Sequence, residues 1–179
     1  MSTSRRGPDS ADPIASYELE VATAEAMREL GAQLAGSLHA GDVLLLSGPL
    51  GAGKTTLAQG IGRGLQVRGQ VASPTFVLAR VHLPFGGGPP LVHVDAYRLG
   101  GPAELDELDL DADLASSVTV VEWGGGIAEP LADDRLEIDI DRDAGSGVDS
   151  ELRLVRIVPV GVRWAGVTFG RLRPSFVDG

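Results

Sequence analysis

The sequence predicts a single-domain α/β fold with three layers, α/β/α, whose central sheet is mixed, largely parallel and carries antiparallel strands at one side. Three observations lead to this prediction. Short apolar runs typical of buried strands alternate with segments whose apolar residues recur at helical spacing. One strand passes through a glycine-rich loop directly into a helix. The chain has 179 residues, 43% of them hydrophobic, which suffices for one core but not comfortably for two.

The first elements follow a mobile tail that we expect over residues 1–16, which are rich in Ser, Asp, Pro and Arg. We expect the main domain over residues 17–160, beginning with a short strand over residues 17–21. Thr23 is a candidate N-cap for the next helix, whose apolar residues are Met27, Leu30, Leu34 and Leu38. A second strand over residues 43–46 leads through the glycine-rich loop to a helix over residues 55–64, with Leu57 and Ile61 on one face.

The later elements are shorter. Residues 71–81 should form a structured loop that leads into a strand, because Pro74 favours extended geometry at Ser73. A Gly/Pro-rich turn over residues 84–90 precedes a strand over residues 91–94. An acidic helical segment over residues 102–114, a buried strand over 118–121 and a hairpin built from 136–140 and 152–158 complete the domain. We expect residues 161–179 to form a C-terminal tail.

Residues 48–55 read Gly-Pro-Leu-Gly-Ala-Gly-Lys-Thr, a complete G-x-x-x-x-G-K-T phosphate-binding loop, or P-loop. Lys54 is the only lysine among 15 basic residues, and its compact ammonium suits β- and γ-phosphate oxygens better than a planar guanidinium does. Loop N–H groups and the positive end of the helix would bind the phosphates, and the Thr55 hydroxyl would bind Mg²⁺. The motif therefore predicts a P-loop NTPase whose nucleotide contacts come from Leu50, Gly51, Ala52, Gly53, Lys54, Thr55 and Thr56.

Two acidic residues come directly after apolar strands. Asp95 follows residues 91–94, and Glu122 follows residues 118–121. Ligands of parallel α/β sheets lie beyond the carboxyl ends of the strands, so both carboxylates should reach the edge where the phosphates bind. Both are candidates for the Mg²⁺ shell, directly or through water. Trp123 comes next, and it could pack in the core, stack on a base or anchor a partner.

Composition excludes several classes of function. A net charge of −10 argues against autonomous binding to DNA or RNA, which requires clustered Lys and Arg. No long apolar run and no secretory h-region is present, so we expect a cytoplasmic protein without a membrane span. The chain has no cysteine, and its 3 histidines are scattered, so any metal should be Mg²⁺ carried with the nucleotide. The acidic runs at 104–113 and 133–149 favour a solvated surface over a docking patch for a basic partner.

Beyond the P-loop, the chain contains Ser-Pro-Thr-Phe at 73–76, His-Val-Asp-Ala-Tyr-Arg-Leu at 93–99, Glu-Leu at 104–105 and Val-Glu-Trp at 121–123. In order and spacing these motifs resemble the TsaE (YjeE) family across roughly residues 19–140. The resemblance implies the ATPase component of the bacterial machinery that installs threonylcarbamoyl on N6 of adenosine 37 in tRNAs reading codons that begin with A. It implies TsaB and TsaD as partners, ATP and Mg²⁺ as cofactors, and contact with tRNA only through the complex.

Carried over by position, the resemblance gives Lys54 and Thr55 the phosphate and Mg²⁺ roles, makes Glu122 the Mg²⁺-side acid and places Asp95 in a mobile motif. It also places Thr75 in a switch-like loop near the γ-phosphate. Lys54, Asp95 and Glu122 are thus the expected catalytic residues, and Thr55 and Glu122 the expected metal ligands. The family commonly follows Glu-Trp with a proline and an acid or amide, whereas this chain has three glycines at 124–126.

Two alternatives use the same loop. A small-molecule kinase would transfer the γ-phosphoryl group to an acceptor hydroxyl and would need an acceptor pocket, usually with an Arg-rich lid. A nucleotide-gated adapter would bind ATP and partners without meaningful turnover. A GTPase is disfavoured because the sequence has no N-K-x-D guanine motif. We see no residue set for the carbonyl chemistry of threonylcarbamoyl transfer, so the chain is expected to be an ATP hydrolase and not the transferase.

Overall fold

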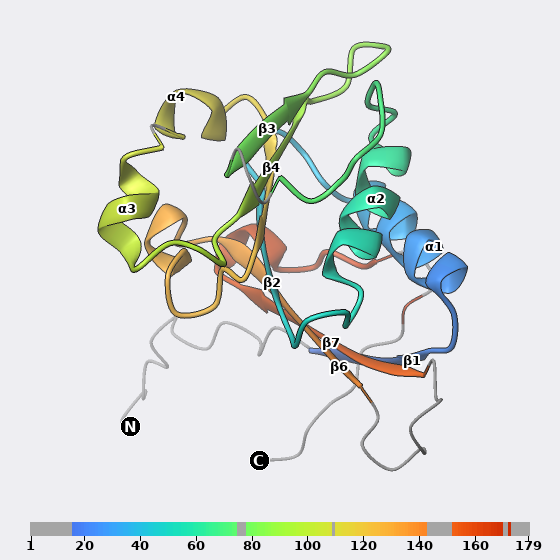
Figure 1. The fold of residues 1–179 in the computed structure, drawn as a ribbon. Helices are drawn as coiled ribbons and strands as arrows, with labels where there is room; N and C mark the ends of the chain where they lie inside the picture. The colour runs from blue at the N-terminus through green and yellow to red at the C-terminus, as the bar shows by residue number, and fades with distance from the viewer. Residues whose placement is uncertain (1–15, 75–77, 109, 143–151, 170–171, 173–179) are drawn as a thin grey trace, which may run out of the picture.

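One mixed sheet lies between two layers of helices. The computed structural model describes residues 16–74, 78–108, 110–142, 152–169 and 172, and within them α1 and α2 cover one face of the sheet while α3 and α4 lie on the other (Figure 1). The prediction of a three-layer α/β/α fold is confirmed. None of the helices in the described ranges is long and apolar enough to cross a membrane.

The central strands are parallel, and antiparallel strands flank them on both sides. In the described residues the strand order is β1-β7-β6-β2-β5-β4-β3. Strands β6, β2, β5 and β4 run parallel, β7 and β1 are antiparallel on one side, and β3 is antiparallel to β4 on the other. We expected antiparallel strands at one side; the second side arises because the short 83–90 connection permits only a hairpin. The strands are β1 Tyr17–Val21, β2 Val43–Ser47, β3 Ala79–His82, β4 Leu91–Asp95, β5 Val118–Glu122, β6 Arg135–Arg142 and β7 Arg153–Val160.

The strand at the centre of the sheet, β2, is buried on both faces. Leu44 and Leu46 contribute to a core cluster under α1 and α2, whereas Val43 and Leu45 contribute to a second cluster under α3 and α4. Strands β4 and β5 are also buried along their whole length. Continuous apolar runs of this kind are what a parallel sheet covered on both faces requires. The parallel register of β2, β5 and β4 brings the carboxyl ends of these buried strands to one edge of the sheet.

Helices α1 Ala24–Ala35 and α2 Lys54–Gly64 pack closely against each other. As predicted, Thr23 caps α1, and its hydroxyl oxygen accepts a hydrogen bond from the N–H of Ala26. Within α2, a side chain at Gly60 would collide with the backbone of Arg28 on α1. This glycine lets the two backbones approach, and the close packing holds the start of α2 against the sheet.

The predicted acidic helix over residues 102–114 is two short helices, α3 Pro102–Asp106 and α4 Asp111–Leu114. Leu105 and Leu110 are both buried in the same cluster. Residues five positions apart lie about 140° apart around a continuous helix, so a break lets both side chains face the core. The sequence pattern could not distinguish this break from one exposed acidic helix.

The segment from residue 161, expected to be a tail, contributes to the core over its first half. Trp164, the last residue of the 3₁₀ turn at Val162–Trp164, and Phe169 after it are buried in the cluster under α1 with Tyr17. Arg163 holds the segment by donating to the Asp42 carboxylate at 2.8 and 2.9 Å. The core therefore extends beyond residue 160. The tail predicted over residues 1–16 lies outside the described residues except for Ser16.

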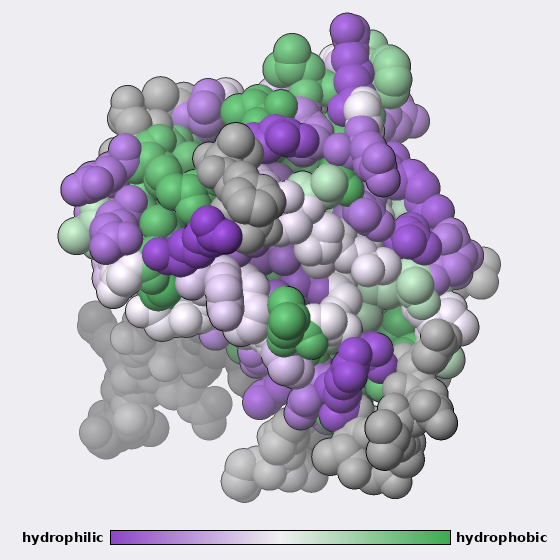
Figure 2. Space-filling view, in the orientation of Figure 1, coloured by the Kyte–Doolittle hydropathy of each residue, from purple (hydrophilic) through white to green (hydrophobic). Residues whose placement is uncertain are grey.

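The surface in Figure 2 differs from one layer to the other. Hydrophilic residues cover the outer face of α1 and α2 and the outer edge of α3, whereas hydrophobic residues form a stripe between α3 and the sheet and lie at the tip of the β3–β4 hairpin. Leu83 and Phe85 at that tip are 59% and 71% exposed.

Candidate functional site

The P-loop joins β2 to α2 at the carboxyl edge of the sheet, as predicted. Gly48 and Gly53 have φ angles of 137° and 115°, which residues with a Cβ atom rarely adopt. At Gly48 a side chain would also collide with the carbonyl oxygen of Ile140 on β6. No side chain caps the start of α2 at Lys54. The N–H groups of this first turn, together with the helix dipole, therefore suit an anion.

Lys54 is tied to its own loop. Its Nζ donates hydrogen bonds to the carbonyl oxygens of Gly48 at 2.7 Å and Pro49 at 2.9 Å. The ring of Trp123 covers the same ammonium, with 3.7 Å between Nζ and the ring centroid. Burial lowers the pKa of Lys54 below its usual value, and the carboxylates of Glu122 and Asp95 oppose part of that decrease. The ammonium is thus held against its own loop and does not extend into solvent.

Glu122 links the loop to the neighbouring strands. Both of its carboxylate oxygens accept from the Thr55 hydroxyl, at 2.8 and 3.0 Å. His93 on β4, which is fully buried, lies with Nε2 2.8 Å from Glu122 Oε1. These contacts fix the carboxylate beside the start of α2. The structure therefore brings together Thr55 and Glu122, the two residues predicted as metal ligands.

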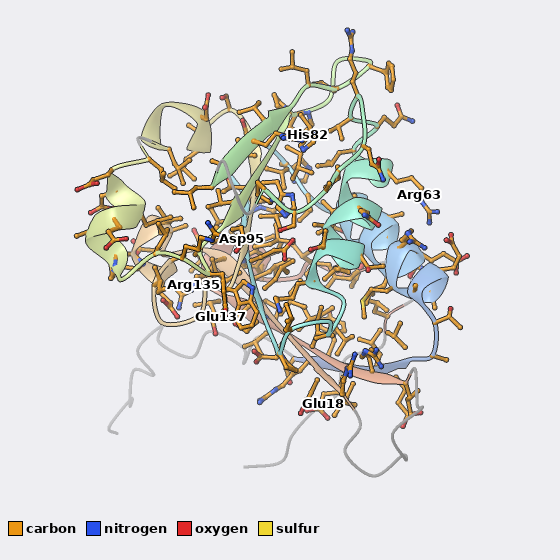
Figure 3. The ribbon with its side chains drawn as sticks, viewed as in Figure 1. Glu18, Arg63, His82, Asp95, Arg135 and Glu137 are labelled. Atoms are coloured by element: carbon orange, nitrogen blue, oxygen red, sulfur yellow. The ribbon has the colours of Figure 1, made fainter. Side chains whose placement is uncertain are left out.

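Asp95 is the direct neighbour of Glu122 across the parallel pair β4–β5. Its carboxylate accepts from the Ser73 hydroxyl at 2.9 Å and from the N–H of Tyr97 at 3.0 Å. Only 4% of Asp95 is exposed, and it lies at the end of β4 near the centre of the molecule (Figure 3). The expectation that the two carboxylates reach one edge of the sheet agrees with this geometry.

A pocket of about 440 Å³ contains most of the predicted site residues. Asp95, Glu122 and Trp123 line it together with the loop and first-turn residues Leu50, Gly51, Gly53, Lys54, Thr55 and Thr56. Tyr97 packs on Trp123, with 4.9 Å between the ring centroids. Thr75, predicted to lie near the γ-phosphate, falls outside the described residues. Ala52 lies on the opposite side of the loop.

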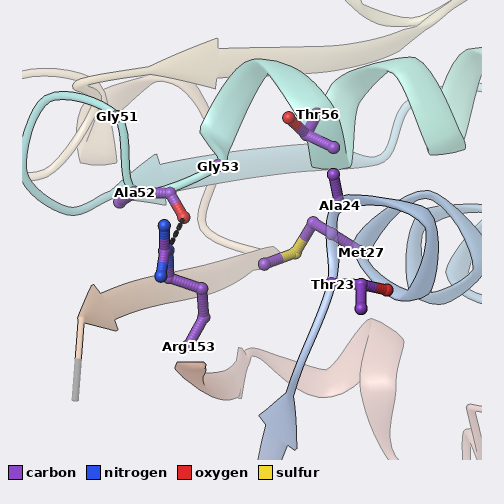
Figure 4. Close-up of a pocket in the computed structure, with 8 residues that line it drawn as sticks. All are labelled: Thr23, Ala24, Met27, Gly51, Ala52, Gly53, Thr56 and Arg153. Atoms are coloured by element: carbon purple, nitrogen blue, oxygen red, sulfur yellow. Dashed lines mark hydrogen bonds between the residues drawn. The ribbon is translucent and has the colours of Figure 1, made fainter. Parts of the chain in front are cut away.

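A second, smaller pocket of about 160 Å³ lies on that opposite side, between the loop and the start of α1 (Figure 4). It shares Gly51, Gly53 and Thr56 with the first pocket, so the two spaces meet across the loop. Its other walls are Thr23, Ala24, Met27, Ala52 and Arg153.

The donor atoms near Glu122 suit a hard cation. The Thr55 hydroxyl and the Glu122 and Asp95 carboxylates are oxygen ligands, which Mg²⁺ prefers. Among the described residues no group of three His, Asp or Glu side chains forms a metal site by itself. Mg²⁺ commonly takes only one or two protein ligands and completes its shell with phosphates and water. The site thus fits a cation that arrives with a nucleotide.

Sequence reasoning missed three contributors. It named His93 only as part of a motif, not as the partner of Glu122. It left the role of Trp123 open, whereas the ring lies on Lys54. It did not consider Arg153, whose Nε donates to the Ala52 carbonyl at 3.1 Å although the two residues are 101 positions apart in the sequence. The alternation along β4 could have pointed to His93, because His93 lies two residues before Asp95.

Comparisons with known proteins show which family the chain resembles. Residues 21–149 match the family model described as threonylcarbamoyl adenosine biosynthesis protein TsaE. A protein of Streptomyces coelicolor named tRNA threonylcarbamoyladenosine biosynthesis protein TsaE is 61% identical over 140 residues, covering 78% of this chain and 94% of that protein. A Mycobacterium leprae protein with the same name is 56% identical over 120 residues, covering 63% and 74% of the two chains.

The fold has a counterpart among solved structures. The crystal structure of YdiB from Bacillus subtilis superposes with a TM-score of 0.65 at 31% sequence identity. The superposition covers 83% of this chain and 88% of that one. The similarity therefore extends over most of the chain, not only over the P-loop motif.

Proposed function

Since the chain belongs to the TsaE family of tRNA threonylcarbamoyladenosine biosynthesis proteins, we propose that it serves this biosynthesis as a P-loop ATPase. In this proposal it binds ATP with Mg²⁺, hydrolyses the ATP slowly and acts with TsaB and TsaD proteins in the cytoplasm. The modification concerned is N6-threonylcarbamoylation of adenosine 37 in tRNAs that read codons beginning with A. The carbonyl chemistry of the transfer belongs to the partners.

One observation carries the proposal. The P-loop, the uncapped start of α2, the Lys54 ammonium and two neighbouring strand-end carboxylates meet in one pocket. Phosphoryl transfer needs few covalent steps from the protein and depends on positioning and charge stabilisation, which this set can supply. The smaller pocket beside Met27 and Arg153 would then receive the adenosine part of the nucleotide.

Each residue has a definite task in this proposal. The N–H groups at the start of α2 bind phosphate oxygens, and Lys54 exchanges the Gly48 and Pro49 carbonyls for β- and γ-phosphate oxygens. Thr55 and Glu122 would hold Mg²⁺, with Asp95 beside them. Bound there, Mg²⁺ supplies neutralisation of the charge that develops on the transferred phosphoryl group. Buried His93 keeps the Glu122 carboxylate oriented.

The role of the partners is supported by charge. A chain with a net charge of −10 cannot bind tRNA tightly by itself, since phosphate backbones need clustered Lys and Arg. We therefore assign tRNA contact to the TsaB–TsaD side of the complex. ATP hydrolysis by this chain would change the state of that complex, with the nucleotide binding one state more tightly than the other.

A nucleotide-gated adapter remains the second candidate because the Lys54 ammonium is bound to other groups of the chain. The ammonium already has two carbonyl partners and an aromatic cover, so ATP must displace these contacts before it is positioned. If the displacement stays incomplete, Lys54 does not reach the γ-phosphate, and the chain would bind ATP without hydrolysing it. A small-molecule kinase has no comparable support, and its product would be a phosphorylated metabolite rather than free phosphate.

The test uses purified chain, TsaB and TsaD from the same organism, tRNA and the threonylcarbamoyl donor, with phosphate and modified adenosine measured together. We expect phosphate release that depends on Mg²⁺ and rises with the partners, and modification that stops when the chain is omitted. Modification without phosphate release would favour the adapter. If omission of the chain leaves modification unchanged over repeated turnovers, the proposed function is wrong.

A further inference from the structure

Two arginines from the end of the β6–β7 pair reach the P-loop. Arg142 and Arg153 are direct partners across the two strands. Arg142 Nη2 lies 3.5 Å from the carbonyl oxygen of Gly51, and Arg153 Nε donates to the carbonyl oxygen of Ala52 at 3.1 Å (Figure 4). The ends of β6 and β7 thus contact the loop that follows β2, the central strand of the sheet.

A loop that turns its N–H groups toward an anion turns several carbonyl groups away from it, and these need donors of their own. Lys54 supplies donors for the first two carbonyls of the loop, and the N–H of Leu57 bonds the carbonyl of Gly53. The carbonyl of Ala52 receives its donor from Arg153. Ala52 is only 1% exposed, so an unpaired carbonyl there would be costly.

Arg153 is itself held in place. Its Nη1 donates to the carbonyl of Leu152 at 3.1 Å while Nε bonds Ala52. Hydrogen bonds from a guanidinium are stronger than those between neutral groups, and its planar fork can serve two carbonyls at once. The guanidinium also forms a wall of the smaller pocket, opposite Met27 on α1 (Figure 4). It therefore lies between the start of β7 and the turn that precedes Gly53.

We propose that Arg153 is a positioning residue for the nucleotide, acting through the Ala52 carbonyl to hold the P-loop in its anion-binding shape. Without this bond, the peptide between Ala52 and Gly53 is free to rotate, and the N–H of Gly53 no longer keeps a fixed direction. The effect on nucleotide affinity rests on the proposed function. The effect on the order of the loop does not.

The test compares Arg153→Met, which removes the donor but keeps the length, with Arg153→Lys, which restores one charged donor. Arg156→Met is the matched control, because Arg156 lies on the same strand and is 52% exposed beside Glu18. Amide hydrogen exchange is measured over residues 48–56 without nucleotide. Affinity is then measured for ATP·Mg²⁺ and for inorganic tripolyphosphate with Mg²⁺.

We expect Arg153→Met to raise exchange in residues 48–56 alone and to weaken both ligands by about tenfold, the scale of one charge-assisted hydrogen bond. Arg153→Lys should recover most of each effect, and Arg156→Met should have none. Loss of ATP affinity with tripolyphosphate binding unchanged would overturn the inference, since Arg153 would then contact the nucleoside directly. Unchanged exchange in the loop, or faster exchange throughout the chain, would overturn it as well. If the unaltered chain binds neither ligand, the proposed function fails while the exchange measurement still decides the role of Arg153.

Discussion

The contact between Trp123 and Lys54 predicts that the indole opposes nucleotide binding. The ring centroid lies 3.7 Å from Nζ, and the ammonium is largely buried beneath it. A desolvated contact of this kind contributes about 1–2 kcal/mol, and ATP must give it up if Lys54 is to reach the phosphates. Since 1.4 kcal/mol corresponds to a tenfold change, Trp123→Leu should bind ATP·Mg²⁺ roughly five- to thirtyfold more tightly.

The assay is calorimetric titration of ATP·Mg²⁺ into the parent and the variant. Tyr97→Leu is the control, because Tyr97 packs on Trp123 at 4.9 Å between ring centroids, whereas the ring that covers Lys54 is that of Trp123. The same movement should be visible by fluorescence in a Trp164→Phe background, where Trp123 is the remaining tryptophan and ATP·Mg²⁺ should change its emission saturably. Weaker binding by Trp123→Leu, or a flat emission titration at concentrations where calorimetry shows binding, would refute the displacement.

Three further predictions follow from the site and the core. Glu122→Gln should keep ATP binding but lower turnover by about 10²-fold, as expected for a group that positions the reacting phosphate or its metal. Asp95→Asn should also slow hydrolysis. Hydrolysis at the parent rate in both variants would mean that neither acid is catalytic. TsaB and TsaD should raise the slow basal ATPase rate several-fold or more, because an arginine supplied by a partner can accelerate P-loop hydrolysis; a rate indifferent to them would argue against partner control. Burial lowers the pKa of His82 below its ordinary 6.5. Near and below that pH the unfolded chain therefore binds more protons than the folded chain, and the free energy of unfolding should fall as pH decreases from 6.5. Chemical denaturation at several pH values should show a shallower fall for His82→Gln than for the parent.

Much of the fold could be predicted because its signals are local. The helix at α1 shows apolar residues at helical spacing after a capping Thr23, and the structure begins it at Ala24. The strands before Asp95 and Glu122 were found as apolar runs, and their parallel pairing places these acids side by side. The strand sets the position of the carboxylate that follows it, so the order of residues in the sequence was sufficient to place Asp95 and Glu122 at the edge of the sheet.

Other features depend on contacts between distant residues. Trp123 has a φ of 60°, unusual for a residue with a side chain, and this conformation aims the ring at Lys54. No sequence pattern predicts it. Arg153 follows Ala52 by about a hundred residues and reaches it only because β7 folds back beside β6. Trp164 and Phe169 lie in a segment without periodicity, so their burial could not be read from spacing.

The most direct test of the account is hydrolysis of ATP·Mg²⁺ under single-turnover conditions by the parent chain and by Lys54→Ala, each with TsaB and TsaD present. The chain can keep its overall fold without the ammonium, although the carbonyls of Gly48 and Pro49 lose their Lys54 donor. Phosphate contacts of this kind contribute about 1.5–3 kcal/mol each, so affinity should fall roughly ten- to a hundredfold. We predict that Lys54→Ala releases no phosphate above background and retains the circular dichroism of the parent. Undiminished phosphate release by a folded Lys54→Ala protein would place the ATPase site elsewhere and contradict the account.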